Sequence, residues 1–240
     1  VQMMYIERKI CDWTNFDKSK KNIKEITESC IEATPWQLLS IDDDPFLELK
    51  RAYNYSSKFK TSDENIKIKK KNKIRIGYFT PDFFEHAGMI NMEGIFKYHN
   101  KDKYEVYGFD YGYQKKDKTH FRIKEYFDNF FYVADMNDNQ IADLSRRHDI
   151  DIAIHRNGHS QNSRSNIFSY RAAPLQLSFL GYPGTTGLDF IDYILADKIV
   201  IPNENIKCFS EKIIFMPDTY YPTFNERKIS TSIVTRNTLG

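Results

Sequence analysis

The chain has 240 residues, a formal net charge of +2 and an aromatic content of 15%. This composition predicts a packed α/β-sized domain and excludes a disordered chain, and the near-neutral charge argues against a nucleic-acid partner. No apolar run approaches the roughly 20 residues that span a bilayer, and no signal peptide is recognisable, so we expect no membrane segment. The cysteines, Cys11, Cys30 and Cys208, have spacings that form neither a disulfide framework nor a metal site. We therefore expect a reducing, cytoplasmic environment.

The first quarter of the chain is predicted to be helical over residues 1–58 and to end in a linker over residues 59–73. Apolar residues recur at three- to four-residue spacing, for example from Phe46 to Tyr53. Asp44 followed by Pro45 is a typical helix start, because Asp accepts hydrogen bonds from free N–H groups and Pro lacks an N–H that would need a partner. Beyond residue 58 this periodicity ends and Lys, Ser, Asp and Asn dominate.

From Ile74 onward, short β-branched runs alternate with helical patterns. The predicted strands are residues 74–79, 104–109, 130–133, 150–154, 175–179, 193–196 and 212–216. The predicted helices pass through residues 92–96 and span residues 121–127, 139–148 and 167–172. Strands that alternate with helices predict βαβ units, and hence a mostly parallel, doubly wound sheet.

Polar or glycine-rich turns follow three of the predicted strands. Asp82 and His86 follow the first strand, Asn157-Gly158-His159-Ser160 the fourth, and the run Gly181–Gly187 the fifth. Because ligands of such sheets bind beyond the carboxyl ends of the strands, we expect the three turns to share one site.

Each turn also has a purely structural interpretation. Asp82 and His86 suit proton transfer near neutral pH, because a carboxylate can orient an imidazole, but they also fit a capping Asp and a surface His. The second turn suits sugar hydroxyls or a phosphate, or is a strand-to-helix turn capped by Ser160 or Asn162. The third turn offers backbone N–H groups to an anion, or is a plain tight turn. It matches neither the P-loop nor the dinucleotide pattern.

Two arginines and two histidines near these turns have open roles. Arg164 and Arg171 either pair with a phosphate or lie on the surface of the short helix between the fourth and fifth strands. His148 and His155 have no further ligand at metal-binding spacing, so we expect no metal.

Together these residues resemble the N-terminal half of the catalytic region of family 41 glycosyltransferases, the O-linked N-acetylglucosamine transferases and their SPINDLY-type relatives. The segments that carry the resemblance are Arg75–Tyr78, Asp82-Phe83 with His86, Asn157–Ser160 with Arg164, Arg171–Leu177, Leu180–Gly187, Asp192–Asp197 and Met216–Tyr220. The run from Ala173 to Gly187 is the most specific, and the resemblance covers nearly the whole chain.

The resemblance implies one Rossmann-like lobe of a two-lobed GT-B transferase. Residues 1–58 would join tetratricopeptide-type repeats to the catalytic region, residues 74–222 would form its N-terminal lobe, and residues 223–240 would begin the connection to a missing second lobe. The implied reaction transfers N-acetylglucosamine from UDP-GlcNAc to Ser or Thr of acceptor proteins, without cofactor or metal. Because the site of such enzymes lies between two lobes, this lobe alone is expected to be inactive.

The resemblance also assigns roles to individual residues. Asp82 and His86 would lie at the active site, with Asp82 as proton acceptor or relay and the general base undecided between the two. The remaining candidates would line the sugar or the acceptor: Asn157, His159, Ser160, Arg164, Leu180, Gly181, Tyr182, Pro183, Gly184 and Thr185. Leu180, Gly181 and Pro183 would border the transferred sugar, and His159 and Ser160 the acceptor.

The chain departs from the family pattern at two places. His155-Arg156 stands where an acidic residue and a leucine are common, and Ala87-Gly88-Met89 after His86 is unusual. These departures either tune the acceptor or mark a diverged member. Three other functions stay open: a SPINDLY-type O-fucosyltransferase that uses GDP-fucose, a non-catalytic Rossmann-like binding module, and another GT-B enzyme such as an epimerase. The epimerase would need more carboxylates at the strand ends than Asp82.

Overall fold

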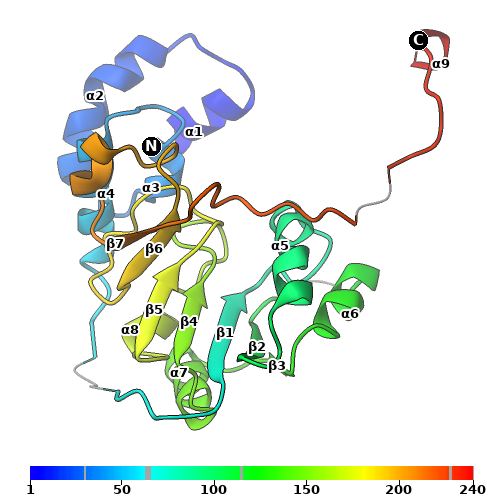
Figure 1. Cartoon of the computed structure of the whole chain (residues 1–240). Helices are drawn as coiled ribbons and strands as arrows, with labels where there is room; N and C mark the ends of the chain where they lie inside the picture. Colours follow the sequence, from blue (N-terminus) through cyan, green and yellow to red (C-terminus); the bar gives the residue numbers. More distant parts are fainter. Residues whose placement is uncertain (30, 63–65, 114–115, 227–228, 240) are drawn as a thin grey trace.

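The computed structural model describes residues 1–29, 31–62, 66–113, 116–226 and 229–239, and its centre is a seven-stranded parallel sheet (Figure 1). The strand order is β3-β2-β1-β4-β5-β6-β7. Cys30 and residues 63–65 of the expected linker lie outside the described residues. All seven expected strands are present, so the predicted doubly wound sheet is confirmed.

The strands differ from their predicted bounds by at most two residues at either end. They are β1 Ile74–Thr80, β2 Tyr104–Asp110, β3 Asn129–Tyr132, β4 Ile152–His155, β5 Leu175–Ser178, β6 Tyr193–Ala196 and β7 Lys212–Phe215. From β1 the chain builds outward through β2 and β3, and then returns to pair β4 with the other side of β1. The β1–β4 junction is therefore the point where the winding direction reverses, which is where doubly wound sheets bind ligands.

Helices precede and flank the sheet. They are α1 Gln2–Lys9, α2 Phe16–Ser29, α3 Pro35–Leu38, α4 Pro45–Ser56, α5 Ala87–Tyr98, α6 Lys118–Lys124, α7 Asp138–Arg147, α8 Asn166–Ser169, the 3-10 helix η1 Asn203–Cys208 and α9 Arg236–Leu239. The helix predicted at residues 121–127 begins at Lys118, because the Asp117 side chain caps it by accepting a hydrogen bond from the His120 N–H at 2.8 Å. The longest described helix, α2, has 14 residues, and none of the described helices is a candidate membrane span.

The alternation of side chains along β1 divides the core into two layers. Tyr78 packs with Met92 and other residues of α5 and α6 on one face. Phe79 points to the opposite face, where its ring stacks on Phe109 at a centroid distance of 4.3 Å among residues of α7 and α8 such as Ile141. Helices thus cover both faces, which leaves the two ends of the strands as the places where a ligand can reach the sheet.

Helix α4 packs against the turn after β5 and against η1. Asp44 caps it as expected, with Oδ1 accepting from the Phe46 N–H at 2.9 Å. The buried side of α4 includes Ala52 and Ser56, whereas the apolar face expected around Phe46 is half exposed. Ser56 Oγ donates to the Thr186 carbonyl at 2.8 Å, which fixes α4 to the turn after β5.

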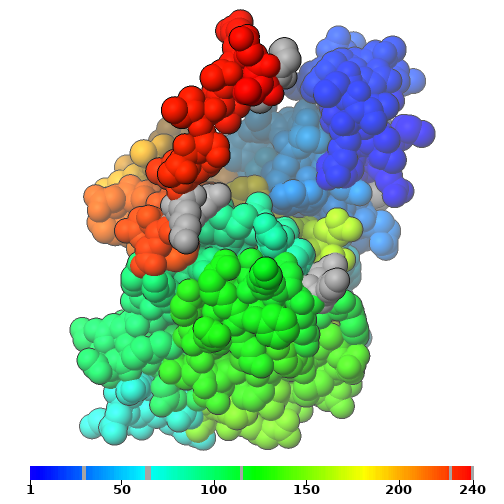
Figure 2. All heavy atoms as spheres, turned by 90° about the vertical axis from the view of Figure 1, so that its right-hand side faces the viewer, coloured from blue at the N-terminus to red at the C-terminus, as the bar shows by residue number. Residues whose placement is uncertain are grey.

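The chain after β7 crosses the carboxyl end of the sheet and packs on α5 (Figure 1). The Asn91 amide donates to the Tyr221 hydroxyl at 2.6 Å, and Phe224 covers Gly94. Figure 2 shows the N-terminal helices and the C-terminal tail projecting from the same end of the molecule. Both terminal segments therefore border the carboxyl edge of the sheet.

We expect Gly187→Ala to destabilise the contact between α4 and the sheet. Gly187 has a φ of +62°, and a Cβ there would lie 2.5 Å from the Ala52 carbonyl carbon. Both the strained backbone and the clash oppose the native state, so the free energy of unfolding should fall by about 2 kcal/mol or more. Urea unfolding measures this loss. Gly184→Ala is the control, because its Cβ would meet only side-chain atoms of Tyr182 at 3.2 Å. Equal losses in the two variants would contradict the expectation.

Candidate functional site

The sheet brings the turns after β1, β4 and β5 together at its carboxyl edge. Thr80 Oγ1 donates to Asn157 Oδ1 at 2.9 Å, and Asn157 Nδ2 donates to Asp82 Oδ2 at 2.8 Å. The Gly181 N–H donates to the Arg156 carbonyl at 2.9 Å. Three segments separated by up to about a hundred residues of sequence thus form one continuous wall.

Asp82 is an ion-paired carboxylate in this wall. Its Oδ2 accepts hydrogen bonds from both Arg156 and Asn157, and its side chain is 13% exposed. No hydrogen bond joins Asp82 to His86 among the described residues, so the carboxylate is oriented by the turn after β4. Arg156 belongs to this site although no sequence motif marks it as a site residue.

His86 is the N-cap of α5. Its Nδ1 accepts a hydrogen bond from the Gly88 N–H at 3.1 Å. An imidazole nitrogen that accepts a hydrogen bond carries no proton, so the neutral ring carries its proton on Nε2. In this arrangement half-buried His86 presents an N–H donor, and not a lone pair, on its other nitrogen.

His159 is a structural link within the second turn. Its Nε2–H donates to the Thr186 carbonyl at 2.6 Å. Its ring packs edge to face with Tyr55 and Tyr182, at centroid distances of 4.9 and 5.3 Å. Burial lowers the pKa of His159 to about 4, so it is neutral at physiological pH. The neighbouring Ser160 is half-buried.

The capping roles considered for Ser160 and Asn162 are wrong. Helix α8 begins after Ser165, which makes no side-chain capping bond. Asn162 instead has a φ of +61°, so it occupies the left-handed turn conformation that Asn tolerates better than most residues.

The third turn is anchored by the buried carboxylate of Glu211, a residue that was not predicted from the sequence. Glu211, which is 4% exposed, accepts from the Thr185 hydroxyl and from the Thr186 N–H, both at 2.7 Å. Tyr182 is buried, whereas Pro183 is exposed at the tip. Nothing in the sequence marks Glu211, because its partners lie about 25 residues away along the chain.

Gly181 is the glycine that allows the closest backbone approach in this turn. A Cβ on Gly181 would lie 2.2 Å from the Arg156 carbonyl oxygen, and a Cβ on Gly184 would touch the Tyr182 ring. Leu180, just before them, has a φ of +74°. The turn is therefore pressed closely against the end of β4.

Arg164 and Arg171 each form an ion pair with an aspartate and a hydrogen bond with a backbone carbonyl of this chain. Arg164 pairs with Asp138, with its Nε 2.7 Å from Oδ1, and also donates to the Met136 carbonyl. Arg171 pairs with Asp192 at 3.1 Å and donates to the Phe190 carbonyl. Each arginine holds loops together, which differs from both the phosphate-pairing and the free-surface interpretation.

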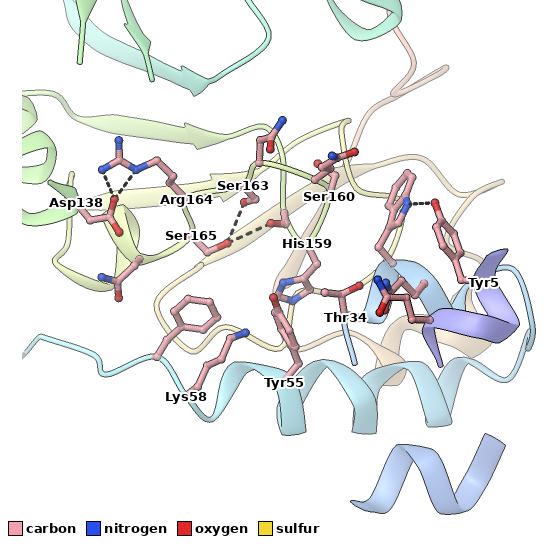
Figure 3. Close-up of a pocket in the computed structure, with 18 of the residues that line it drawn as sticks. Tyr5, Thr34, Tyr55, Lys58, Asp138, His159, Ser160, Ser163, Arg164 and Ser165 are labelled. Atoms are coloured by element: carbon pink, nitrogen blue, oxygen red, sulfur yellow. Dashed lines mark hydrogen bonds and ion pairs between the residues drawn. The ribbon is translucent and has the colours of Figure 1, made fainter. Parts of the chain in front are cut away.

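A pocket of about 780 Å³ lies beside the second turn (Figure 3). Figure 3 shows Tyr55 on α4 and Lys58 just beyond its end facing Ser160, Ser163 and Arg164 across it. Its lining comprises Gln2, Tyr5, Ile6, Lys9, Thr34, Trp36, Gln37, Tyr55, Lys58, Phe59, Asp138 and the segment 158–166.

The pocket is aromatic and positively charged. The Lys58 ammonium lies 3.4 Å from the centroid of the Tyr55 ring, and Lys9 lies over Tyr5. Asp138, the acidic residue of the lining, is paired with Arg164, which leaves the two lysines as its excess charge. Across the described parts of the chain, no three His, Cys, Asp or Glu side chains gather as a metal site would require.

We expect the stability of the protein to fall in acid partly because of His159. The folded-state pKa of about 4 lies below the ordinary value of 6.5, so the unfolded chain binds the proton more readily. His159 therefore contributes about 3 kcal/mol to the free energy of unfolding. This contribution is fully present above pH 6.5 and is lost as the pH falls toward 4. Urea unfolding of the wild type and His159→Gln across this range measures it. A decline equally steep in both proteins would contradict this role.

The chain matches known proteins over most of its length. Residues 47–236 match the family model "Glycosyl transferase family 41". The probable UDP-N-acetylglucosamine–peptide N-acetylglucosaminyltransferase SEC of Arabidopsis thaliana is 29% identical over an alignment of 234 residues that covers 88% of this chain and 24% of that protein. The corresponding transferase of Caenorhabditis elegans is 27% identical over an alignment of 235 residues that covers 88% of this chain and 20% of that protein.

A third relative and one solved structure complete the comparison. The probable transferase SPINDLY of Arabidopsis thaliana is 31% identical over 163 residues, 67% of this chain and 18% of that protein. A variant of the O-GlcNAc transferase of Thermobaculum terrenum shares the fold, with a TM-score of 0.74 and 20% identity over 86% of this chain and 42% of that chain. This chain thus spans a quarter or less of the length of these curated relatives. Given the match over residues 47–236, the chain belongs to glycosyl transferase family 41.

Proposed function

We propose that this chain forms one wall of the active site of a protein O-glycosyltransferase. The complete enzyme moves a sugar from a nucleotide donor to a Ser or Thr hydroxyl of an acceptor protein. The observation that carries the proposal is the family match over residues 47–236, because it contains all three turns that meet at the carboxyl edge. Since the chain spans a quarter or less of its curated relatives, the activity is assigned to the complete polypeptide.

The domain assignment follows from the same proposal. Residues 1–58 connect repeats to the catalytic region, residues 59–73 form a linker, residues 74–222 form the N-terminal lobe, and residues 223–240 lead toward a second lobe. The two terminal segments border the edge of the sheet where a second lobe would close the site (Figure 2). We place the enzyme in the cytoplasm, with no metal or cofactor.

The proposed reaction is a direct displacement at the anomeric carbon. The acceptor oxygen forms the new bond to this carbon, the bond to the nucleotide diphosphate breaks, and the hydroxyl proton leaves. Asp82 and His86 are the proposed catalytic pair, and Asp82 accepts this proton, because the lone pair of the neutral His86 ring is already occupied by the Gly88 N–H. An N–H donor on His86 Nε2 and the backbone of the turn from Leu180 to Gly184 suit oxygen atoms of the sugar or the leaving group.

The donor is UDP-N-acetylglucosamine in this proposal, in line with the names of the relatives. GDP-fucose is the alternative, and the second lobe, which reads the nucleotide base, decides between them. The pocket of about 780 Å³ beside Ser160 is the proposed seat of the acceptor segment, because it adjoins the wall and is lined by hydroxyls, amides and aromatic rings.

We expect Asp82→Asn and His86→Ala to lower sugar transfer by the complete polypeptide by about 100-fold, the usual contribution of a proton-transferring side chain. The assay follows radiolabel from UDP-GlcNAc, and in parallel from GDP-fucose, into acceptor protein. The control is Arg75→Leu, since Arg75 pairs with Glu105 at the opposite end of the sheet. Wild-type rates in both site variants would refute the assignment, and no transfer from either donor would favour the binding-module alternative.

The acceptor pocket generates a separate expectation. Ser160→Trp should raise the KM for the acceptor about tenfold or more, because the indole obstructs the pocket beside the second turn, while the KM for the nucleotide sugar stays within about twofold. Ser40→Trp is the matched control, since Ser40 is exposed and outside the pocket lining. A change in the donor KM alone would place the acceptor elsewhere.

A further inference from the structure

Arg156 is the residue that joins all three turns. It is 5% exposed. Its guanidinium pairs with Asp82 in the turn after β1, and its carbonyl accepts the Gly181 N–H in the turn after β5. It follows β4 directly, so one buried side chain and its own backbone connect three strand ends.

Gly88 provides the space that Arg156 occupies. A Cβ on Gly88 would lie 1.4 Å from Arg156 Nη2 and 2.5 Å from Cζ. Gly88 lies in the first turn of α5 without a positive φ, so its backbone alone does not require glycine. The absence of a side chain at Gly88 therefore leaves the space in which the guanidinium lies, and a methyl group there would have to displace it.

The charge of Arg156 depends on Asp82. The guanidinium lies beside the N-terminal end of α5, where the helix dipole is positive and disfavours a cation. Burial lowers the pKa of Arg156, and the Asp82 carboxylate opposes this effect. Arg156 Nε has no hydrogen-bond partner among the described residues. Asp82 is therefore the group that makes the buried cation tolerable, and the two side chains hold each other in place.

The pair leaves one oxygen of Asp82 available. Arg156 and Asn157 both donate to Oδ2, and no described residue donates a hydrogen bond to Oδ1. We propose that Arg156 is a positioning residue that fixes Asp82 so that Oδ1 meets the substrate, and that Gly88 is the space this arrangement requires. The role in catalysis rests on the proposed function above.

The test uses the complete polypeptide and steady-state kinetics with both substrates. Arg156→Leu should lower kcat between about 10- and 100-fold, because a displaced reacting group costs about that much, with the KM for the nucleotide sugar within about threefold. Arg156→Lys keeps the charge and should recover part of the loss. Arg75→Leu removes an arginine of the Arg75–Glu105 ion pair at the far end of the sheet and should leave kcat unchanged.

A double-mutant cycle separates positioning from mere structural support. If Arg156 acts through Asp82, the variant Asp82→Asn/Arg156→Leu should be no slower than Asp82→Asn alone. Gly88→Ala should lower kcat by displacing the guanidinium, and should cost nothing further once Arg156 is Leu, whose shorter side chain leaves room for the methyl group. If Arg156→Leu does not fold, Gly88→Ala is the variant that still tests the pair, because it displaces the guanidinium without removing Arg156.

Two outcomes would overturn the inference: a wild-type kcat in Arg156→Leu, or losses from Asp82→Asn and Arg156→Leu that multiply. A wild type that transfers sugar from neither donor is a failure of the proposed function instead. The coupling of Arg156 to Asp82 is then measured by the free energies of unfolding of the same four proteins, where non-additivity supports the pair and additivity overturns it.

Discussion

The buried ion pair between Asp82 and Arg156 is the interaction on which the geometry of the carboxyl edge depends. The sheet alone places the ends of β1, β4 and β5 near one another, but it leaves the direction of the turns undefined. The guanidinium fixes the first turn to the second, and the Arg156 carbonyl fixes the second to the third. Because neither charge has another strong partner among the described residues, loss of either leaves a buried charge that is costly to keep.

A second network, made of buried hydrogen bonds, fixes the turn after β5. Glu211 binds Thr185 and the Thr186 N–H, while the Thr186 carbonyl accepts from His159 and from Ser56 of α4. The turn after β5 is thus attached at once to β7, to the turn after β4 and to the N-terminal helices. A site built this way is preorganised, since its backbone cannot shift without breaking several buried hydrogen bonds.

The sequence predicts the sheet well because its signals are local. Alternating and β-branched runs such as residues 74–79 identify strands, and the Asp44-Pro45 pair identifies the start of α4. Contacts between distant segments leave no such local signal. In the sequence, nothing distinguishes Glu211 from an exposed acidic residue, although it is buried in the structure. The contact between Arg156 and Gly88 joins residues 68 positions apart, and neither residue type alone indicates it.

Local patterns also mislead where tertiary contacts decide. Phe46 and Tyr53, whose spacing predicts the helix α4, are half exposed, whereas its buried side includes Ala52 and Ser56, because small residues allow the turn at Gly187 to approach. Arg164 and Arg171 seem available for a phosphate in sequence, but the carboxylates that bind them, Asp138 and Asp192, become neighbours only on folding.

The pattern of hydrogen-bond partners among the site residues indicates where a substrate would lie. Asp82 Oδ2, His159 and the threonines of the third turn are all engaged by protein partners. Asp82 Oδ1 and His86 Nε2 have no such partner among the described residues, and they are an acceptor and, in the neutral ring, a donor at the end of β1. A hydroxyl that attacks a sugar needs an acceptor for its proton, and the sugar or its leaving group needs a donor. Both groups lie at the strand end where the winding of the sheet reverses, which is where doubly wound sheets bind ligands.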